Sequence, residues 1–190
     1  IRGGTEKIKY YGNIGFLDQE TMFKENAGGF KRYNLRSNVD AQITDNLSAQ
    51  VDISHIWGIQ DLPWRMANPG GGSIWQEYWN SEPFFNPTNP DGSLAYGGSG
   101  GSVGIHALSN KEHGGYNKNE NEQLQTSIAL NYDFSSLVPG LKARVFANIN
   151  QSNNFNKYWR FLPNSYTYNF SNDSYTQNNI QSAPDLVHRD

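Results

Sequence analysis

Apolar and polar residues alternate with a period of two between Phe30 and Ile43. Successive side chains of a strand point to opposite sides of a sheet, so this segment predicts a strand with one apolar and one polar face. The apolar face has one polar member, Ser37, and otherwise carries Tyr33, Leu35, Val39, Ala41 and Ile43. The opposite face carries Arg32, Asn34, Arg36, Asn38, Asp40 and Gln42. Two such different faces require two different environments, one on each side of the sheet.

Four other segments repeat this alternation, so we expect an all-β chain whose strands form an antiparallel up-and-down meander. The five strands are predicted at about residues 7–19, 30–43, 47–59, 120–134 and 141–156. Turn-forming residues predict short turns at about 44–46 and 135–140, and longer loops at about 20–29, 60–119 and 160–190. Inside the second loop, the segment from Ser73 to Trp79 fits a short helix with Ser73 as its N-cap.

The long loops all fall at one end of this meander and the short turns at the other. Such asymmetry is typical of an outer-membrane barrel, whose turns face the periplasm and whose loops face outside. The charges agree, because an Arg or Lys on the lipid face near the midplane costs about 2–4 kcal/mol. With the apolar face outward, the charged side chains point into a water-filled lumen, whereas a slip of one residue turns them to lipid. The residues predicted to face the lumen in a structural role are Arg32, Arg36, Asp40, Asp52 and Arg144.

The composition narrows the choice of class. Hydrophobic residues make up only 36% of the chain, yet aromatic residues reach 14%, which is usual in transmembrane β-barrels and in some secreted lectin-like domains. The net charge of -3 offers no basic surface for nucleic acid, and no apolar run approaches the ~18 residues of a membrane helix. Cysteine is absent, which excludes disulfides and thiol chemistry. Five strands cannot close a barrel in lipid, so we expect either part of a larger barrel or a soluble protein.

Three motifs carry a resemblance to a known family. They are GGTEKIKYY from Gly3, GFLDQE from Gly15 and GFKRYNLRSNVD from Gly29. In sequence and order they resemble the first third of the barrel of SusC/RagA-type TonB-dependent transporters. The match is specific from Gly3 to Trp57, weaker through the last two predicted strands, and uninformative in the long loops. Phe16 and Thr21 stand where the family often has Tyr and Gly.

The resemblance implies part of a large transmembrane β-barrel of about 22 strands with long extracellular loops. It also implies the outer membrane of a Bacteroidota-like Gram-negative bacterium, and active import of glycans, oligosaccharides or peptides driven by TonB. The expected partners are a SusD-like lipoprotein at the extracellular face, TonB, outer-membrane lipid and the transported nutrient. We expect the plug domain, the TonB box and the carboxy-terminal strand of that family to lie outside these 190 residues. The charges on the polar face would pair across strands or hold the plug.

Aromatic side chains crowd the long loop at 60–119. Such rings stack on sugar rings and peptide side chains, and they equally pack loops on themselves or against a partner protein. Both roles stay open for the candidate substrate- or partner-contacting residues, which are Trp64, Trp75, Tyr78, Trp79, Phe84, Phe85 and Tyr96.

No pattern points to an enzyme, a cofactor or a metal. Close carboxylates such as Asp18 and Glu20 have no nucleophile–base set beside them and fit ordinary solvated acids. The glycines of GGSGGSVG from Gly97 lack the Lys-Ser/Thr ending of a phosphate loop. Asn89 and Asp91 fit a turn better than a calcium loop, and the four histidines lack metal-ligand spacing.

Two other functions stay open beside an active importer. One is a soluble β-sandwich that binds carbohydrate through its aromatic loops, and the other is a passive porin. A requirement for detergent separates the barrel from the sandwich, whereas a plug and a TonB box separate the importer from the porin.

Overall fold

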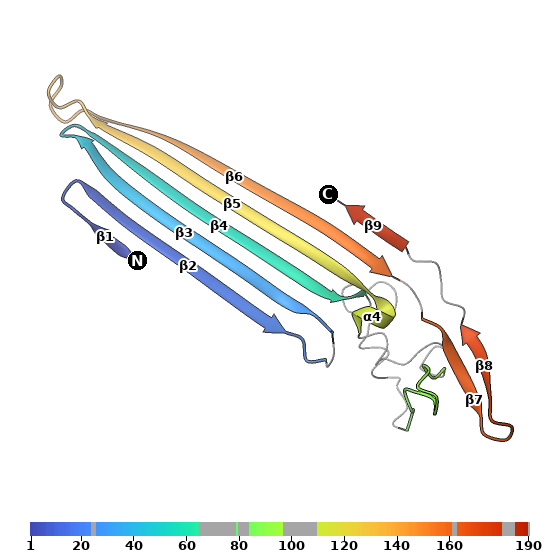
Figure 1. Ribbon diagram of the computed structural model, residues 1–190. Coiled ribbons are helices and arrows are strands. Elements are labelled where there is room, and N and C mark those ends of the chain that lie inside the picture. Colours follow the sequence, from blue (N-terminus) through green and yellow to red (C-terminus); the bar gives the residue numbers. More distant parts are fainter. Residues whose placement is uncertain are drawn as a thin grey trace. The chain divides into compact units, whose positions relative to one another are not determined.

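The computed structural model describes residues 1–23, 26–64, 79, 84–96, 110–160, 163–179 and 185–189. Strands dominate these ranges, and their one named helix is α4 (Lys111–Gly114). The larger sheet has seven strands in the order β1-β2-β3-β4-β5-β6-β9, so strands that follow one another in the chain lie side by side (Figure 1). Its strands are β1 (Arg2–Gly4), β2 (Ile8–Glu20), β3 (Gly29–Thr44), β4 (Leu47–Pro63), β5 (Gly115–Asp133), β6 (Lys142–Arg160) and β9 (Asp185–Arg189). The predicted all-β class and antiparallel up-and-down order are confirmed.

A second sheet has two strands, β7 (Ser165–Asn169) and β8 (Ser174–Asn179). These strands, and β9 after them, lie within the segment that the sequence predicted as the loop at 160–190. The structure also carries β4 to Pro63 and starts β5 at Gly115, inside the loop predicted at 60–119. The residues from Gly115 to Asn119 (GYNKN) are mostly polar on both sides of the strand, so hydrophobic alternation could not mark them.

The chain forms two compact units. The strand unit consists of Ile1–Asp18, Lys31–Ile59 and Glu120–Asn154. The loop unit consists of Gln19–Phe30, Gln60–Asn119 and Phe155–Asp190. The three segments predicted as long loops therefore belong mainly to one unit, and the alternating parts of the strands to the other.

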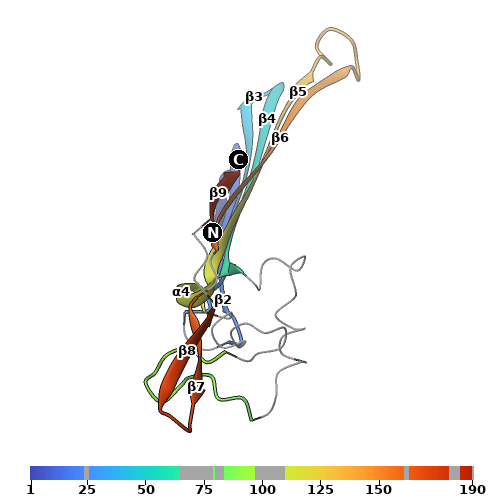
Figure 2. The same ribbon diagram turned by 90° about the vertical axis from the view of Figure 1, so that its right-hand side faces the viewer.

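The strand unit is a single layer of β-structure with little core of its own. Figure 2 shows β3, β4, β5 and β6 nearly edge-on, as one layer. The buried apolar side chains of all described residues are Ala27, Pro63, Ala95 and Ala129, and only the last belongs to this unit. Large side chains on the sheet are exposed, such as Ile14 at 84% and Val145 at 69%. An antiparallel sheet normally buries at least one face, so the apolar face of this one needs a cover from outside the described strands.

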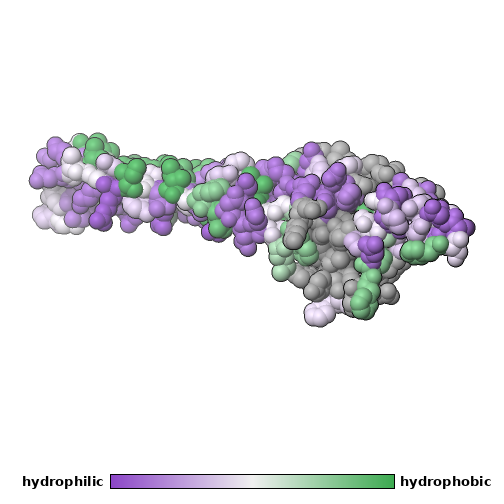
Figure 3. Space-filling view, turned by 60° about the horizontal axis from the view of Figure 1, so that its bottom comes forward, coloured by the Kyte–Doolittle hydropathy of each residue, from purple (hydrophilic) through white to green (hydrophobic). Residues whose placement is uncertain are grey.

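The two faces segregate as their alternation predicts. Apolar residues run along one side of the sheet and polar residues along the other (Figure 3, in the elongated part at the left). On the apolar face, the ring of Tyr33 lies 5.1 Å from Phe16 and 5.4 Å from Trp57, measured between centroids. On the polar face, Asn38 donates from its amide to the carboxylate of Asp52 on the neighbouring strand.

A glycine supports the loop unit where helix α4 meets strand β5. Gly115 has a φ of 84°, a left-handed value that side chains other than glycine rarely adopt, and it is buried. A Cβ atom placed there would overlap the backbone carbonyl oxygen of Trp159. Gly92 has the same φ of 84° but open space around it. A side chain at Gly92 would therefore meet backbone strain alone, whereas one at Gly115 would meet both backbone strain and steric overlap.

We therefore expect Gly115→Ala to destabilise the loop unit and Gly92→Ala to cost only the strain of the backbone, about 1–2 kcal/mol. Limited proteolysis followed by mass spectrometry measures the effect, with cleavage sites read separately in each unit. Equal protection of the two variants would contradict the close approach of β5 and β6 at Gly115.

Candidate functional site

The apolar face of the strand unit is the most extensive candidate surface. Its side chains run from Ile8 to Phe16 on β2, from Tyr33 to Ile43 on β3 and from Leu47 to Trp57 on β4. On β5 they run from Leu124 toward the end of the strand, and on β6 up to Ile149. We call this surface the apolar band. It makes a continuous apolar surface across five neighbouring strands.

Polar side chains form a chain of contacts near one end of the apolar band. The backbone bond from Gln42 N to Lys7 O and the ring contacts of Tyr33 fix the register of β2, β3 and β4, and place Ile14, Leu35 and His55 in one row. His55 Nε2 lies 2.8 Å from Glu122 Oε1 on β5. Glu122 Oε2 in turn accepts from Asn153 Nδ2 on β6 at 3.3 Å. The row is thus apolar on β2 and β3, whereas His55 on β4 begins a polar chain that continues on β5 and β6.

The apolar band ends at the same level on β2, β3 and β4. Phe16, Tyr33 and Trp57, which stand at its ends on these strands, contact one another through their rings. On β5 and β6 polar side chains interrupt the apolar alternation earlier: Glu122 stands next to Leu124 on this face of β5, and Asn153 lies between Ile149 and Phe155 on β6.

The length of the band can be compared with the thickness of a membrane. Tyr33 and Ile43 lie ten residues apart on β3, which is about 33 Å along a strand. At the tilt of about 35–45° that is usual in closed barrels, this length would project to about 23–27 Å, and the apolar band of outer-membrane barrels is about 25 Å tall. A second pair at the upper border, Lys31 Nζ and Asp18 Oδ2 at 3.3 Å, ends the band on β2 and β3.

The charged residues predicted to face the lumen lie on the polar face and are exposed. Asp52 accepts the bond from Asn38 described above. Within the part of the chain that the structure describes, Arg32, Arg36, Asp40 and Arg144 have no ion pair. The charges on this face do not neutralise one another within the described strands, and they are free to meet water or another part of the protein.

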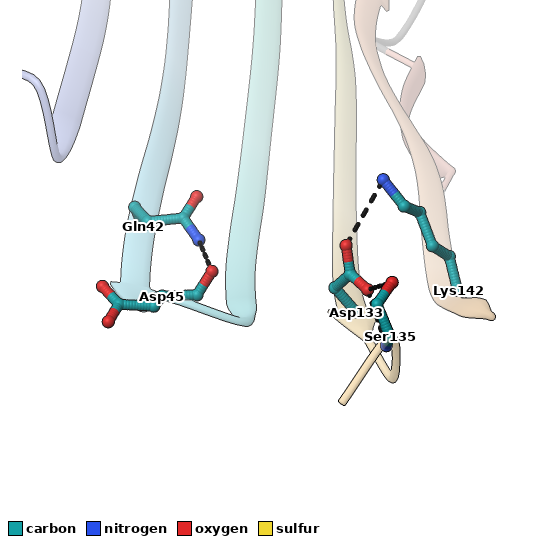
Figure 4. Close-up of polar contacts among 5 residues, drawn as sticks. All are labelled: Gln42, Asp45, Asp133, Ser135 and Lys142. Carbon is teal, nitrogen blue, oxygen red and sulfur yellow. Dashed lines mark hydrogen bonds and ion pairs between the residues drawn. The ribbon is translucent and has the colours of Figure 1, made fainter. Parts of the chain in front are cut away.

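Polar side chains gather at the end of the sheet where the short turns lie (Figure 4). At the end of β3, Gln42 donates to the backbone oxygens of Thr44 at 2.7 Å and Asp45 at 3.4 Å. At the end of β5, Asp133 accepts from the backbone N–H and the hydroxyl of Ser135 and pairs with Lys142 at 3.4 Å. A hollow of about 340 Å³ lies between these ends and includes Arg144 in its lining. These bonds fix the geometry of the turns, with no nucleophile or metal set among them.

The structure divides the aromatic candidates of the loop unit into two groups. Trp64 is half-buried, with the ring of Tyr158 at 4.6 Å and the guanidinium of Arg160 at 5.5 Å from its own ring. Phe85 and Tyr96 are half-buried as well. Trp79 and Phe84 are exposed, at 81% and 99%. Trp75 and Tyr78 lie outside the described residues. So does the helix predicted from Ser73 to Trp79, except for Trp79 itself.

The loop segment from 84 to 96 is anchored to strand β7. Tyr166 gives its N–H to Leu94 O and accepts from Tyr96 N, both at 2.9 Å. Asn89 Nδ2 donates to Tyr166 O at 3.0 Å. In the turn between Asn89 and Leu94, hydrogen bonds donated by Ser93 hold the pKa of the Asp91 carboxyl below its ordinary value. These bonds give Asn89 and Asp91 a structural role, in line with the turn that the sequence predicted there.

The β7–β8 hairpin is a feature that the sequence analysis missed. The signal was present but short: Tyr166, Tyr168 and Phe170 alternate with polar residues just before the turn-forming run Ser171-Asn172-Asp173. Tyr168 faces Tyr175 across the hairpin, with their ring centroids 5.0 Å apart. The carboxylate of Asp173 accepts a bond of 2.7 Å from the Tyr168 hydroxyl and raises the pKa of that phenol.

An ion pair joins β4 and α4 in the loop unit. Lys111 Nζ pairs with Asp61 Oδ2 at 3.0 Å beside a shallow hollow of about 370 Å³. Among the described residues, no group of three or more His, Cys, Asp or Glu side chains could hold a metal ion. No helix in the described ranges is long and apolar enough to cross a membrane.

Comparisons with known proteins identify no family for this chain. No protein-family model matches it, and no curated protein matches it either.

The two groups of aromatic residues should respond differently to truncation. Trp64→Ala removes the contacts with Tyr158 and Arg160, so we expect a loss of about 2–4 kcal/mol in the stability of the loop unit. Phe84→Ala removes a ring that is 99% exposed and should leave stability within about 0.5 kcal/mol. Hydrogen exchange of the loop unit measures both. Similar losses for the two variants would show that exposure does not separate packing residues from contact residues here.

Proposed function

We propose that this chain is part of the barrel of an outer-membrane, TonB-dependent active importer of nutrients, either glycans and oligosaccharides or peptides. It works with a SusD-like lipoprotein at the extracellular face, with TonB acting through a plug, and it has no catalytic activity of its own. In this role the apolar band of the strand unit faces lipid, and the polar face lines the lumen. The transported nutrient passes along that polar face.

The exposed apolar band is the observation that carries the proposal. It covers one face of a single-layered sheet whose other face is polar, which suits a barrel wall between lipid and a water-filled lumen. Its length along β3 fits the height of such a wall at the strand tilt usual in barrels. Near one end of the band, Lys31 pairs with Asp18 and His55 with Glu122, as is expected where lipid tails end and headgroups begin.

The soluble sandwich is supported less well. A β-sandwich packs a second sheet about 10 Å from the first, and the apolar side chains of both form its core. Within the described residues of the strand unit there is one sheet, and its apolar side chains are uncovered. A porin would share the band and the polar face. The motifs from Gly3 to Asp40, through their resemblance to TonB-dependent transporters, favour the active importer over the porin.

Cysteine labelling tests which face meets lipid, because the chain has no native cysteine. Val39 and Ala41 belong to the apolar band and Asp40, between them, to the polar face. We expect spin labels at Val39→Cys and Ala41→Cys, in the intact protein in liposomes, to be relaxed by oxygen dissolved in lipid. The matched control Asp40→Cys should be relaxed by a water-soluble nickel complex. A soluble protein with labels at 39 and 41 shielded from both reagents would refute the barrel.

Energy coupling separates the importer from the porin. In cells that depend on the intact protein for growth on an oligosaccharide or peptide, we expect deletion of TonB to abolish growth on that nutrient as fully as deletion of the protein. A porin passes solutes by diffusion and would leave growth unchanged without TonB. Growth on a monosaccharide or a free amino acid is the control for general fitness.

A further inference from the structure

Charge is distributed unevenly along the polar face of the strand unit. On β3 this face carries Arg32, Arg36 and Asp40. From Asn121 to Ser127 on β5 and from Phe146 to Asn154 on β6, the same face carries no charged side chain. We call the polar-face residues of these two ranges the amide strip. Six of them are amides, namely Asn121, Gln123, Gln125, Asn148, Asn150 and Asn154.

The six amides of the strip are exposed, and they are not bonded to one another. Within the part of the chain that the structure describes, no hydrogen bond reaches their side chains. Amides on this face do pair where a neighbour allows it, because Asn131, nearer the turn, donates to Ser48 Oγ at 3.4 Å. Each amide offers two N–H donors and one carbonyl acceptor. The strip therefore presents unused donors and acceptors side by side, without charge.

One large aromatic side chain stands among these amides. Phe146 follows Lys142 and Arg144 at steps of two residues, so it lies on the polar face of β6. Its side chain is 74% exposed. A phenyl ring gains free energy when apolar surface is covered, so this ring favours a ligand that has an apolar face of its own.

We propose that the amide strip binds a neutral oligosaccharide, with Phe146 stacked on one sugar ring and the amides bonded to sugar hydroxyls. A sugar ring combines an apolar face with hydroxyls that both donate and accept, which is what an aromatic ring among amides can bind. From Phe146 to Asn154 the strip spans eight residues of β6, about 26 Å, which accommodates several sugar units. The inference rests on the proposed function and names the class of nutrient that meets this part of the wall.

The strip suits the other classes of nutrient less well. A charged polymer would find no counter-charge between Phe146 and Asn154. A peptide commonly binds a sheet by adding a strand at an open edge, through its backbone. The amide strip lies instead on the face of two neighbouring strands, β5 and β6, where side chains are the groups on offer.

The test measures ligand binding to the intact protein in detergent by calorimetry. The neutral probes are oligomers of glucose, mannose, fructose and xylose, whereas an oligogalacturonate represents charged sugars and an oligoalanine represents peptides. We expect at least one neutral oligomer to bind, and the other two probes not to bind. Phe146→Ala should weaken that binding about tenfold, and Phe146→Tyr, which keeps a ring, should bind as wild type does. Asn150→Leu removes hydrogen-bonding groups at similar size and should weaken binding severalfold.

The matched control for Phe146→Ala is Val145→Ala. Val145 is the preceding residue, is 69% exposed and lies on the apolar band, so its truncation should leave binding unchanged. A fluorescent label gives a second readout, because the chain has no native cysteine. We expect the bound oligomer to shift the emission of a label at Ser152→Cys, on the strip, and not at Gln151→Cys, on the opposite face.

The other outcomes overturn the inference in different ways. If only the oligogalacturonate or the oligoalanine binds, the class of nutrient is wrong and the importer stands. Equal binding of the neutral oligomer by wild type and Phe146→Ala, with no shift of the label at position 152, would place its site elsewhere. A cysteine at 152 that does not react in the intact protein would show that another part of the protein covers the strip. If no probe binds, the strip has no ligand, and growth without TonB then decides separately whether the importer stands.

Discussion

The hydrogen-bond register between neighbouring strands is the constraint on which this structure depends. Because side chains alternate, a shift of one residue in any strand would exchange its apolar and polar faces. The contacts of Tyr33 with Phe16 and Trp57 and the bond between Asn38 and Asp52 exist only in one register. The same register keeps Arg32 and Arg36 together on the polar face. One register therefore fits surroundings that are apolar on one side of the sheet and polar on the other.

Alternation in the sequence was enough to predict the strands whose two faces differ. Tyr33 to Ile43 is such a segment, because each residue type there reports the side on which it lies. Where both faces are polar, as from Gly115 to Asn119, the pattern is silent although the backbone still pairs. The β7–β8 hairpin was not predicted for a related reason. A strand of five residues contains too few apolar–polar alternations to be distinguished from a polar loop.

The sequence pattern could not predict contacts between segments that are far apart in the chain. Trp64 is a candidate for substrate or partner contact, and the structure adds packing contacts with Tyr158 and Arg160 of β6, which are far away in the chain. The polar chain of His55, Glu122 and Asn153 likewise needs the pairing of β4 with β5 and β6. Local periodicity places a residue on a face, whereas only register tells its height on that face.

The His55–Glu122 pair bears on how a barrel built from these strands would respond to its bilayer. Because His55 lies in the same row as the apolar Leu35, a thicker bilayer would draw the polar pair toward the hydrocarbon, and a thinner one would expose Leu35 to water. Both displacements oppose the change, at a modest cost for each ångström of mismatch. The bonded polar pairs at the border would thus set the depth at which the wall rides, and with it the membrane thickness that suits the protein.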